Sequence, residues 1–145
     1  MTTVAREQAP GKETPADPIT EYQQTYPGWA DQVRQVRRHL AEHLGKCPAA
    51  DDALVVLSEF ATNAILHSRS RGGHFTIRVA LSRDSVRLEC QDAGGAWRGR
   101  HSRQQDHDDR PHGLDVVEAL TGGPAGWGVQ VTGDGGRIVW ATLAW

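Results

Sequence analysis

The sequence has no long apolar run and almost no net charge, and each absence excludes a class of protein. No stretch approaches the roughly 20 apolar residues that a membrane-spanning helix needs, and the first 18 residues contain no hydrophobic signal segment. With 16 Lys and Arg against 18 Asp and Glu, the formal charge of −2 argues against a protein that coats nucleic acid or a membrane surface. We therefore expect a cytoplasmic protein without a direct nucleic-acid partner.

Cysteine is also scarce. Cys47 and Cys90 lie far apart and outside any C-x-x-C pattern, so neither a zinc knuckle nor a redox pair is indicated, and both are expected to be buried thiols. Residues 1–19 are rich in Pro, Thr and charge without apolar periodicity, which predicts a flexible tail. The remaining residues 20–145 are long enough for one domain with one core.

Two helices are predicted in the first half of this domain. Apolar residues recur at steps of three and four from Trp29 to Leu44, and Gly45 follows as a C-cap. A second, more apolar helix is expected over about residues 49–68. Three polar side chains at i, i+4 and i+8 share one line of this helix: Glu59, Asn63 and His67. Polar groups on so apolar a helix require a partner or a function.

The second half is predicted to form strands. Alternation of period two over residues 75–91 indicates a β-hairpin, and it carries Asp92 onto the inward face. A short helix from Gly113 and two strands over 127–132 and 137–145 follow. This order predicts an α+β fold, a two-layer sandwich with helices on one face of a mixed, mainly antiparallel sheet. The other face is expected to be more exposed or to form a homodimer.

Residues 95–112 break all periodicity, and so long a polar connection inside a compact domain predicts a lid or a disordered loop. Its His and Asp residues suggest a divalent-metal cluster as an alternative, but their spacing matches no closed zinc pattern, so a solvated lid is favoured. These residues are His101, Asp106, His107, Asp108, Asp109 and His112.

Three separated features together predict a nucleotide site. The amide oxygen of Asn63 suits Mg²⁺, and Glu59, one turn away, is placed to accept a proton from the group that attacks a γ-phosphate. Asp92 is expected to accept a hydrogen bond from the adenine amine, with Gly94 allowing close approach to the ring. The helix N-terminus at Gly113 offers N–H groups to phosphates.

The residues also allow plainer interpretations. Glu59 and Asn63 are alternatively a solvated helix pair, and Asp92 is alternatively a turn-initiating residue that binds its own backbone. His67 is as well explained by a structural histidine as by one that faces phosphate.

Three segments resemble the N-box and the two glycine boxes of the Bergerat-type ATP-binding fold. In chain order they read SEFATNAILHS, DAGG and PHGLDVVEAL. The resemblance covers roughly residues 26–145 and is greatest to the stand-alone anti-sigma-factor serine kinases. It implies Mg²⁺-ATP as cofactor, with Glu59 as general base and Asn63 as the metal ligand. Asp92 and Gly94 would contact adenine, and the remaining nucleotide-binding positions implied are His67, His112, Gly113 and Leu114.

The same resemblance implies a function in transcription regulation by partner switching. The expected activity is phosphorylation of an anti-anti-sigma (STAS-type) protein, with a sigma factor as a second partner. The chain departs from the family at Pro111, where the second glycine box usually has its first glycine; proline has no N–H to offer a phosphate. The alternative is therefore a non-catalytic module whose binding to a sigma factor or its antagonist is tuned by ATP. ATP hydrolysis as in gyrase-like relatives is less favoured.

Overall fold

The computed structural model describes residues 19–68, 72–94, 112–123 and 126–145, and for residues 112–114 it describes the backbone alone. Five strands and three helices lie within these ranges. They are β1 (Thr20–Pro27), α2 (Gln32–Leu44), α3 (Ala50–His67), β2 (His74–Leu81), β3 (Ser85–Asp92), α5 (His112–Leu120), β4 (Trp127–Val131) and β5 (Arg137–Ala144). The predicted tail and the segment 95–111 lie outside the described residues.

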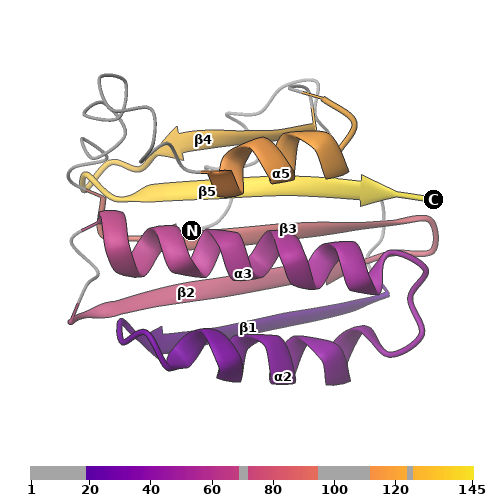
Figure 1. Cartoon of the computed structure of the whole chain (residues 1–145), viewed down its shortest axis with the longest axis horizontal. Helices are drawn as coiled ribbons and strands as arrows, with labels where there is room; N and C mark the ends of the chain where they lie inside the picture. The colour runs from indigo at the N-terminus through magenta and orange to yellow at the C-terminus, as the bar shows by residue number, and fades with distance from the viewer. Residues whose placement is uncertain (1–18, 69–71, 95–111, 124–125) are drawn as a thin grey trace.

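The strands form one sheet in the order β1-β2-β3-β5-β4, and all four pairings are antiparallel. The three helices cover the same face of this sheet: α2 runs beside β1, α3 crosses β2 and β3, and α5 lies near β4 and β5 (Figure 1). The predicted α+β two-layer fold with helices on one face is therefore confirmed. No parallel pairing occurs among the described strands.

The core lies between the helices and the sheet. The amphipathic pattern of α2 buries Val36, Leu40 and Leu44, and the helix ends at Gly45, whose φ of 54° is unfavourable for residues with a Cβ. Trp29 does not join this helix: α2 begins at Gln32, and the indole is 58% exposed. The prediction of a helix starting at Trp29 was wrong by three residues.

α3 is the central helix of the layer. Its buried side chains come from much of its circumference because it contacts β3, α2 and α5. Every second residue of the β2–β3 hairpin faces the core on the helix side of the sheet, among them Ile77, Val79 and Leu88. This alternation confirms the predicted hairpin and brings Asp92, the last residue of β3, into the interior at 5% exposure.

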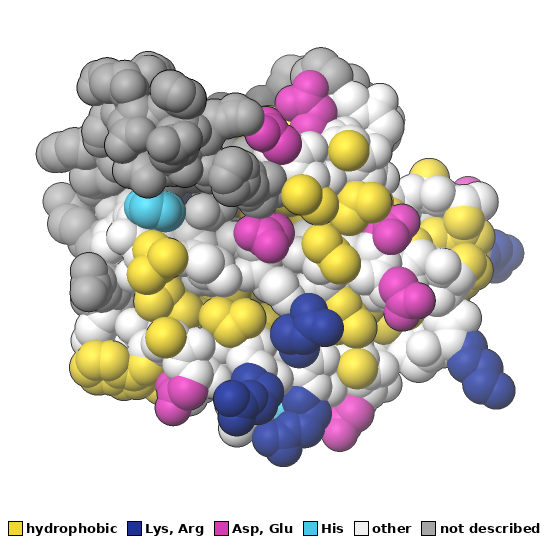
Figure 2. All heavy atoms as spheres, in the orientation of Figure 1, with side chains coloured by type: hydrophobic (Ala, Val, Ile, Leu, Met, Phe, Trp, Pro, Cys, Tyr) yellow, Lys and Arg dark blue, Asp and Glu magenta, His cyan; other side chains and the backbone are white. Residues whose placement is uncertain are grey.

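Basic side chains gather on the helix face, and the centre of the opposite face of the sheet is buried. On the helix face, Lys and Arg side chains gather over α2, where Arg34, Arg37 and Arg38 are exposed (Figure 2). On the opposite face of the sheet, Arg87 and Trp140 are only 3% and 6% exposed, so the expectation of a more exposed face does not hold at its centre. No helix in the described ranges is long and apolar enough to cross a membrane.

Candidate functional site

Glu59 and Asn63 occupy successive turns of α3. Asn63 is 8% exposed, whereas Glu59 is half-buried and retains access to solvent. The Nδ2 atom of Asn63 is buried and has no hydrogen-bond partner among the described residues. Since an unpartnered buried amide costs about 1–3 kcal/mol, this side chain suits a position where a bound group completes its hydrogen bonding.

Asn63 fits a Mg²⁺ site in its chemistry. An amide carries one hard oxygen donor and one N–H₂ donor, so a single side chain can bind a cation through oxygen and a phosphate or water through nitrogen. Among the described residues, no group of three or more His, Cys, Asp or Glu side chains forms a protein-only metal site. A Mg²⁺ ion at Asn63 would therefore take most of its ligands from phosphate oxygens and water.

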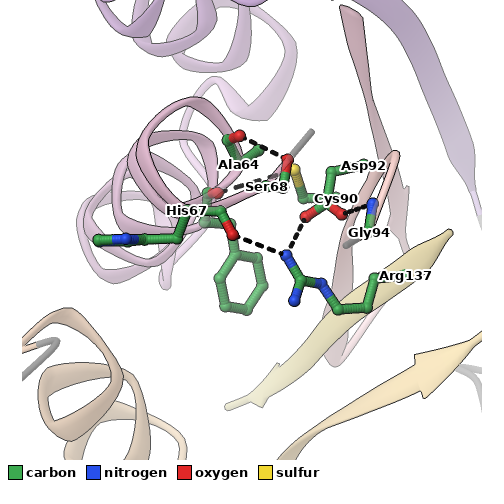
Figure 3. Close-up of polar contacts among 8 residues, drawn as sticks. Ala64, His67, Ser68, Cys90, Asp92, Gly94 and Arg137 are labelled. Atoms are coloured by element: carbon green, nitrogen blue, oxygen red, sulfur yellow. Dashed lines mark hydrogen bonds and ion pairs between the residues drawn. The ribbon is translucent and has the colours of Figure 1, made fainter. Parts of the chain in front are cut away.

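Asp92 lies at the end of β3 with one donor on each carboxylate oxygen. The backbone N–H of Gly94 donates to Oδ1 at 2.7 Å, and Nη2 of Arg137 lies 3.3 Å from Oδ2 (Figure 3). Burial raises the pKa of the Asp92 carboxyl, and the charge of Arg137 and the Gly94 hydrogen bond oppose that rise. The Gly94 contact is the local backbone bond expected of a turn residue, and it leaves further lone pairs for a ligand.

Gly94 has a φ of +76°, and a Cβ at this position would collide with the carbonyl oxygen of Gly135. The close approach that requires glycine is therefore to the β4–β5 turn. The role of Gly94 beside adenine remains a prediction.

Arg137 is the site residue that the sequence interpretation missed. It is the first residue of β5, 5% exposed, and pairs across the ladder with Asp92. Its Nη2 also donates to the backbone oxygen of His67 at 3.3 Å, which joins the end of α3 to the carboxylate (Figure 3). The alternation of side chains along β5 could have placed it in the interior, because Arg137 lies on the same inward face as Val139 and Ala141. The same rule placed Asp92 on the inward face of β3 with Cys90.

His67 is the last residue of α3, and its imidazole points away from the Asp92–Arg137 pair (Figure 3). It reaches that pair through its backbone carbonyl rather than its ring. The predicted phosphate-facing role of the ring stays a prediction.

Three elements with predicted site residues are neighbours in space. α3 packs against β3 and α5, and Cys90 of β3 donates to the backbone oxygen of Phe60, between Glu59 and Asn63 on the helix. The backbone of His112, Gly113 and Leu114 forms the first turn of α5, while their side chains lie outside the described part. The predicted lid, Pro111 and the alternative metal cluster, apart from the His112 backbone, also lie outside it.

The chain is similar to known proteins in both sequence and fold. The family described as Histidine kinase-like ATPase domain matches residues 27–140. The crystal structure of the RsbU and RsbW domains of Rv1364c from Mycobacterium tuberculosis aligns with a TM-score of 0.64 and 23% identity. The alignment covers 88% of this chain and 33% of that one, so it supports the fold alone. No curated protein matches the chain.

Proposed function

The chain belongs to the histidine kinase-like ATPase domain family, and from this premise we propose that it is a Mg²⁺-ATP-dependent protein serine/threonine kinase. Its proposed substrate is a serine or threonine of an anti-anti-sigma (STAS-type) protein, and its proposed role is partner switching with a sigma factor. The observation that carries the proposal is the buried, unpartnered amide of Asn63 one turn from half-buried Glu59.

The proposed reaction uses few protein groups. Glu59 accepts the proton of the substrate hydroxyl while the hydroxyl oxygen bonds to the γ-phosphorus of ATP. The bond between the γ-phosphorus and the oxygen that bridges it to the β-phosphate breaks, and ADP leaves. Asn63 is the protein ligand of Mg²⁺, which when bound neutralises charge on the phosphates. The first turn of α5 offers backbone N–H groups to the same phosphates.

Nucleotide binding is tested by calorimetric titration of ATP with Mg²⁺ and with a chelator. We expect wild type to bind ATP more tightly with Mg²⁺, and Asn63→Ala to lose that difference. Thr62→Ala, a half-buried neighbour on the same helix, is the matched control and should behave as wild type. Absence of ATP binding by wild type would reject the proposal.

Catalysis is tested by transfer of labelled phosphate from ATP to anti-anti-sigma proteins. Glu59→Gln should lower the transfer rate by about 10²–10⁴-fold, the usual contribution of a positioned base, without a matching loss of ATP affinity. Glu42→Gln, which changes an exposed carboxylate on α2, is the control. Undiminished transfer by Glu59→Gln would remove Glu59 from the role of base.

A non-catalytic, ATP-tuned binding module is the second candidate. It is favoured by Pro111, which removes an N–H from the second glycine box. Stable binding of a sigma factor or its antagonist, with ATP-dependent affinity and no phosphate transfer, would select this function over the kinase.

A further inference from the structure

Arg137 occupies an interior position on the helix side of the sheet. Its side chain is 6% exposed and follows the same inward alternation as Val139 and Ala141 of β5. A buried guanidinium loses hydration that only paired charges and hydrogen bonds can replace. Its neighbours therefore define its role.

Two oxygen atoms on different elements are among those neighbours. Nη2 lies 3.3 Å from Oδ2 of Asp92 and 3.3 Å from the backbone oxygen of His67. One nitrogen thus ties the carboxylate at the end of β3 to the last residue of α3 (Figure 3). α3 is also the helix that carries Glu59 and Asn63. Arg137 therefore connects Asp92, the predicted contact to adenine, to the helix that carries the predicted general base and Mg²⁺ ligand.

We propose that Arg137 is the positioning residue for nucleotide-base recognition: it fixes the Asp92 carboxylate so that an oxygen lone pair faces a 6-amino purine. This inference rests on the proposed function, because it assumes that ATP binds at Asp92. Each carboxylate oxygen has two lone-pair sites and one is used on each, by Gly94 and by Arg137. The carboxylate can therefore accept a hydrogen bond from an exocyclic amine without losing either existing bond. The carbonyl oxygen of a 6-oxo purine has no proton to donate and would face the carboxylate oxygen directly.

Within the described ranges, few other ionisable groups act on Asp92. On β3 the Cys90 thiol is its neighbour; α3 contributes the backbone oxygen of His67, with the ring turned away, and β5 contributes Arg137. Burial raises the pKa of the Asp92 carboxyl, and Arg137 is the largest influence that lowers it. Without Arg137 the carboxyl would become protonated at a higher pH and would lose acceptor capacity for an amine.

The test compares Arg137→Met with wild type in affinity for ATP, GTP and purine riboside triphosphate, which lacks the 6-amino group, over a pH series. We expect wild type to prefer ATP over purine riboside triphosphate, with ATP affinity falling in acid. In Arg137→Met the ratio of ATP affinity to purine riboside triphosphate affinity should fall by about tenfold. The decrease of ATP affinity in acid should begin at a higher pH. Arg87→Met removes an equally buried arginine from the opposite face of the sheet and controls for lost stability.

Arg137→Lys separates charge from geometry. The lysine keeps a cation near Asp92, so the acid limb should stay close to that of wild type, but it lacks the planar fork and part of the ATP preference should be lost. If both variants keep the wild-type ATP preference and acid limb, Arg137 is structural and the inference fails while ATP binding stands. If wild type binds none of the three nucleotides, the proposed function itself fails, and the inference with it.

Discussion

Gly94 shows how one residue connects the candidate site to the rest of the sheet. Its N–H holds Oδ1 of Asp92, while its Cα faces the turn between β4 and β5 so closely that a Cβ would meet the Gly135 carbonyl. Glycine is required there both by backbone conformation and by space. Two different physical costs are therefore combined at one position.

These costs can be separated by two alanine substitutions. Gly72 has a φ of +77°, close to the +76° of Gly94, but open space where its Cβ would lie. Gly72→Ala should lower the free energy of unfolding by about 1–2 kcal/mol, the cost of left-handed backbone. Gly94→Ala should cost about 1–3 kcal/mol more because the turn must move. Chemical denaturation measures both, and equal losses would show that the turn yields freely.

Strand β3 carries a second buried arginine, Arg87, on the opposite face of the sheet. The guanidinium carbon of Arg87 lies 4.7 Å from the Trp140 ring centroid, and Arg87 Nε lies 2.9 Å from Oε2 of Glu89. The cation is thus paired with a carboxylate and an aromatic face while almost fully buried. This arrangement explains how the sheet tolerates an arginine at its centre.

A double-mutant cycle of Arg87→Met and Trp140→Leu should give a coupling energy of about 1–2 kcal/mol, as expected for a desolvated cation over indole. Arg78, on β2, also pairs with Glu89 but is separated from Trp140 by strand β3. The cycle of Arg78→Met with Trp140→Leu should therefore be additive within about 0.5 kcal/mol. Equal coupling in the two cycles would attribute the effect to Glu89 rather than to the indole.

How far the elements follow from sequence depends on how much of each is buried. The β2–β3 hairpin was predicted because apolar and polar residues alternate along its sequence, and α3 because it is an apolar segment of helical length. β1 was not, because this edge strand buries only Tyr26 and its other side chains leave no pattern. Asp92 was placed correctly by alternation, whereas its partner Arg137 depends on the long-range register of β3 with β5.

At the scale of the whole molecule, the candidate site joins elements from both halves of the chain. α3 contributes Glu59 and Asn63, β3 contributes Asp92, and β5, at the far end of the sequence, contributes Arg137. The neighbouring α5 packs against α3. A ligand held by several of these elements at once opposes their separation and should stabilise the entire domain.

Mg²⁺-ATP should accordingly raise the free energy of unfolding by about 2.7 kcal/mol when ATP is at 100 times its dissociation constant. The thermal unfolding midpoint should rise with it. The stabilisation should depend on the nucleotide concentration and shrink in Asn63→Ala when Mg²⁺ is present. Gly72→Ala lowers the starting stability without touching the site, so it should keep the full ligand-induced increase. Scanning calorimetry over an ATP series checks this, and an unfolding midpoint that does not change with ATP would contradict a site built from both halves of the chain.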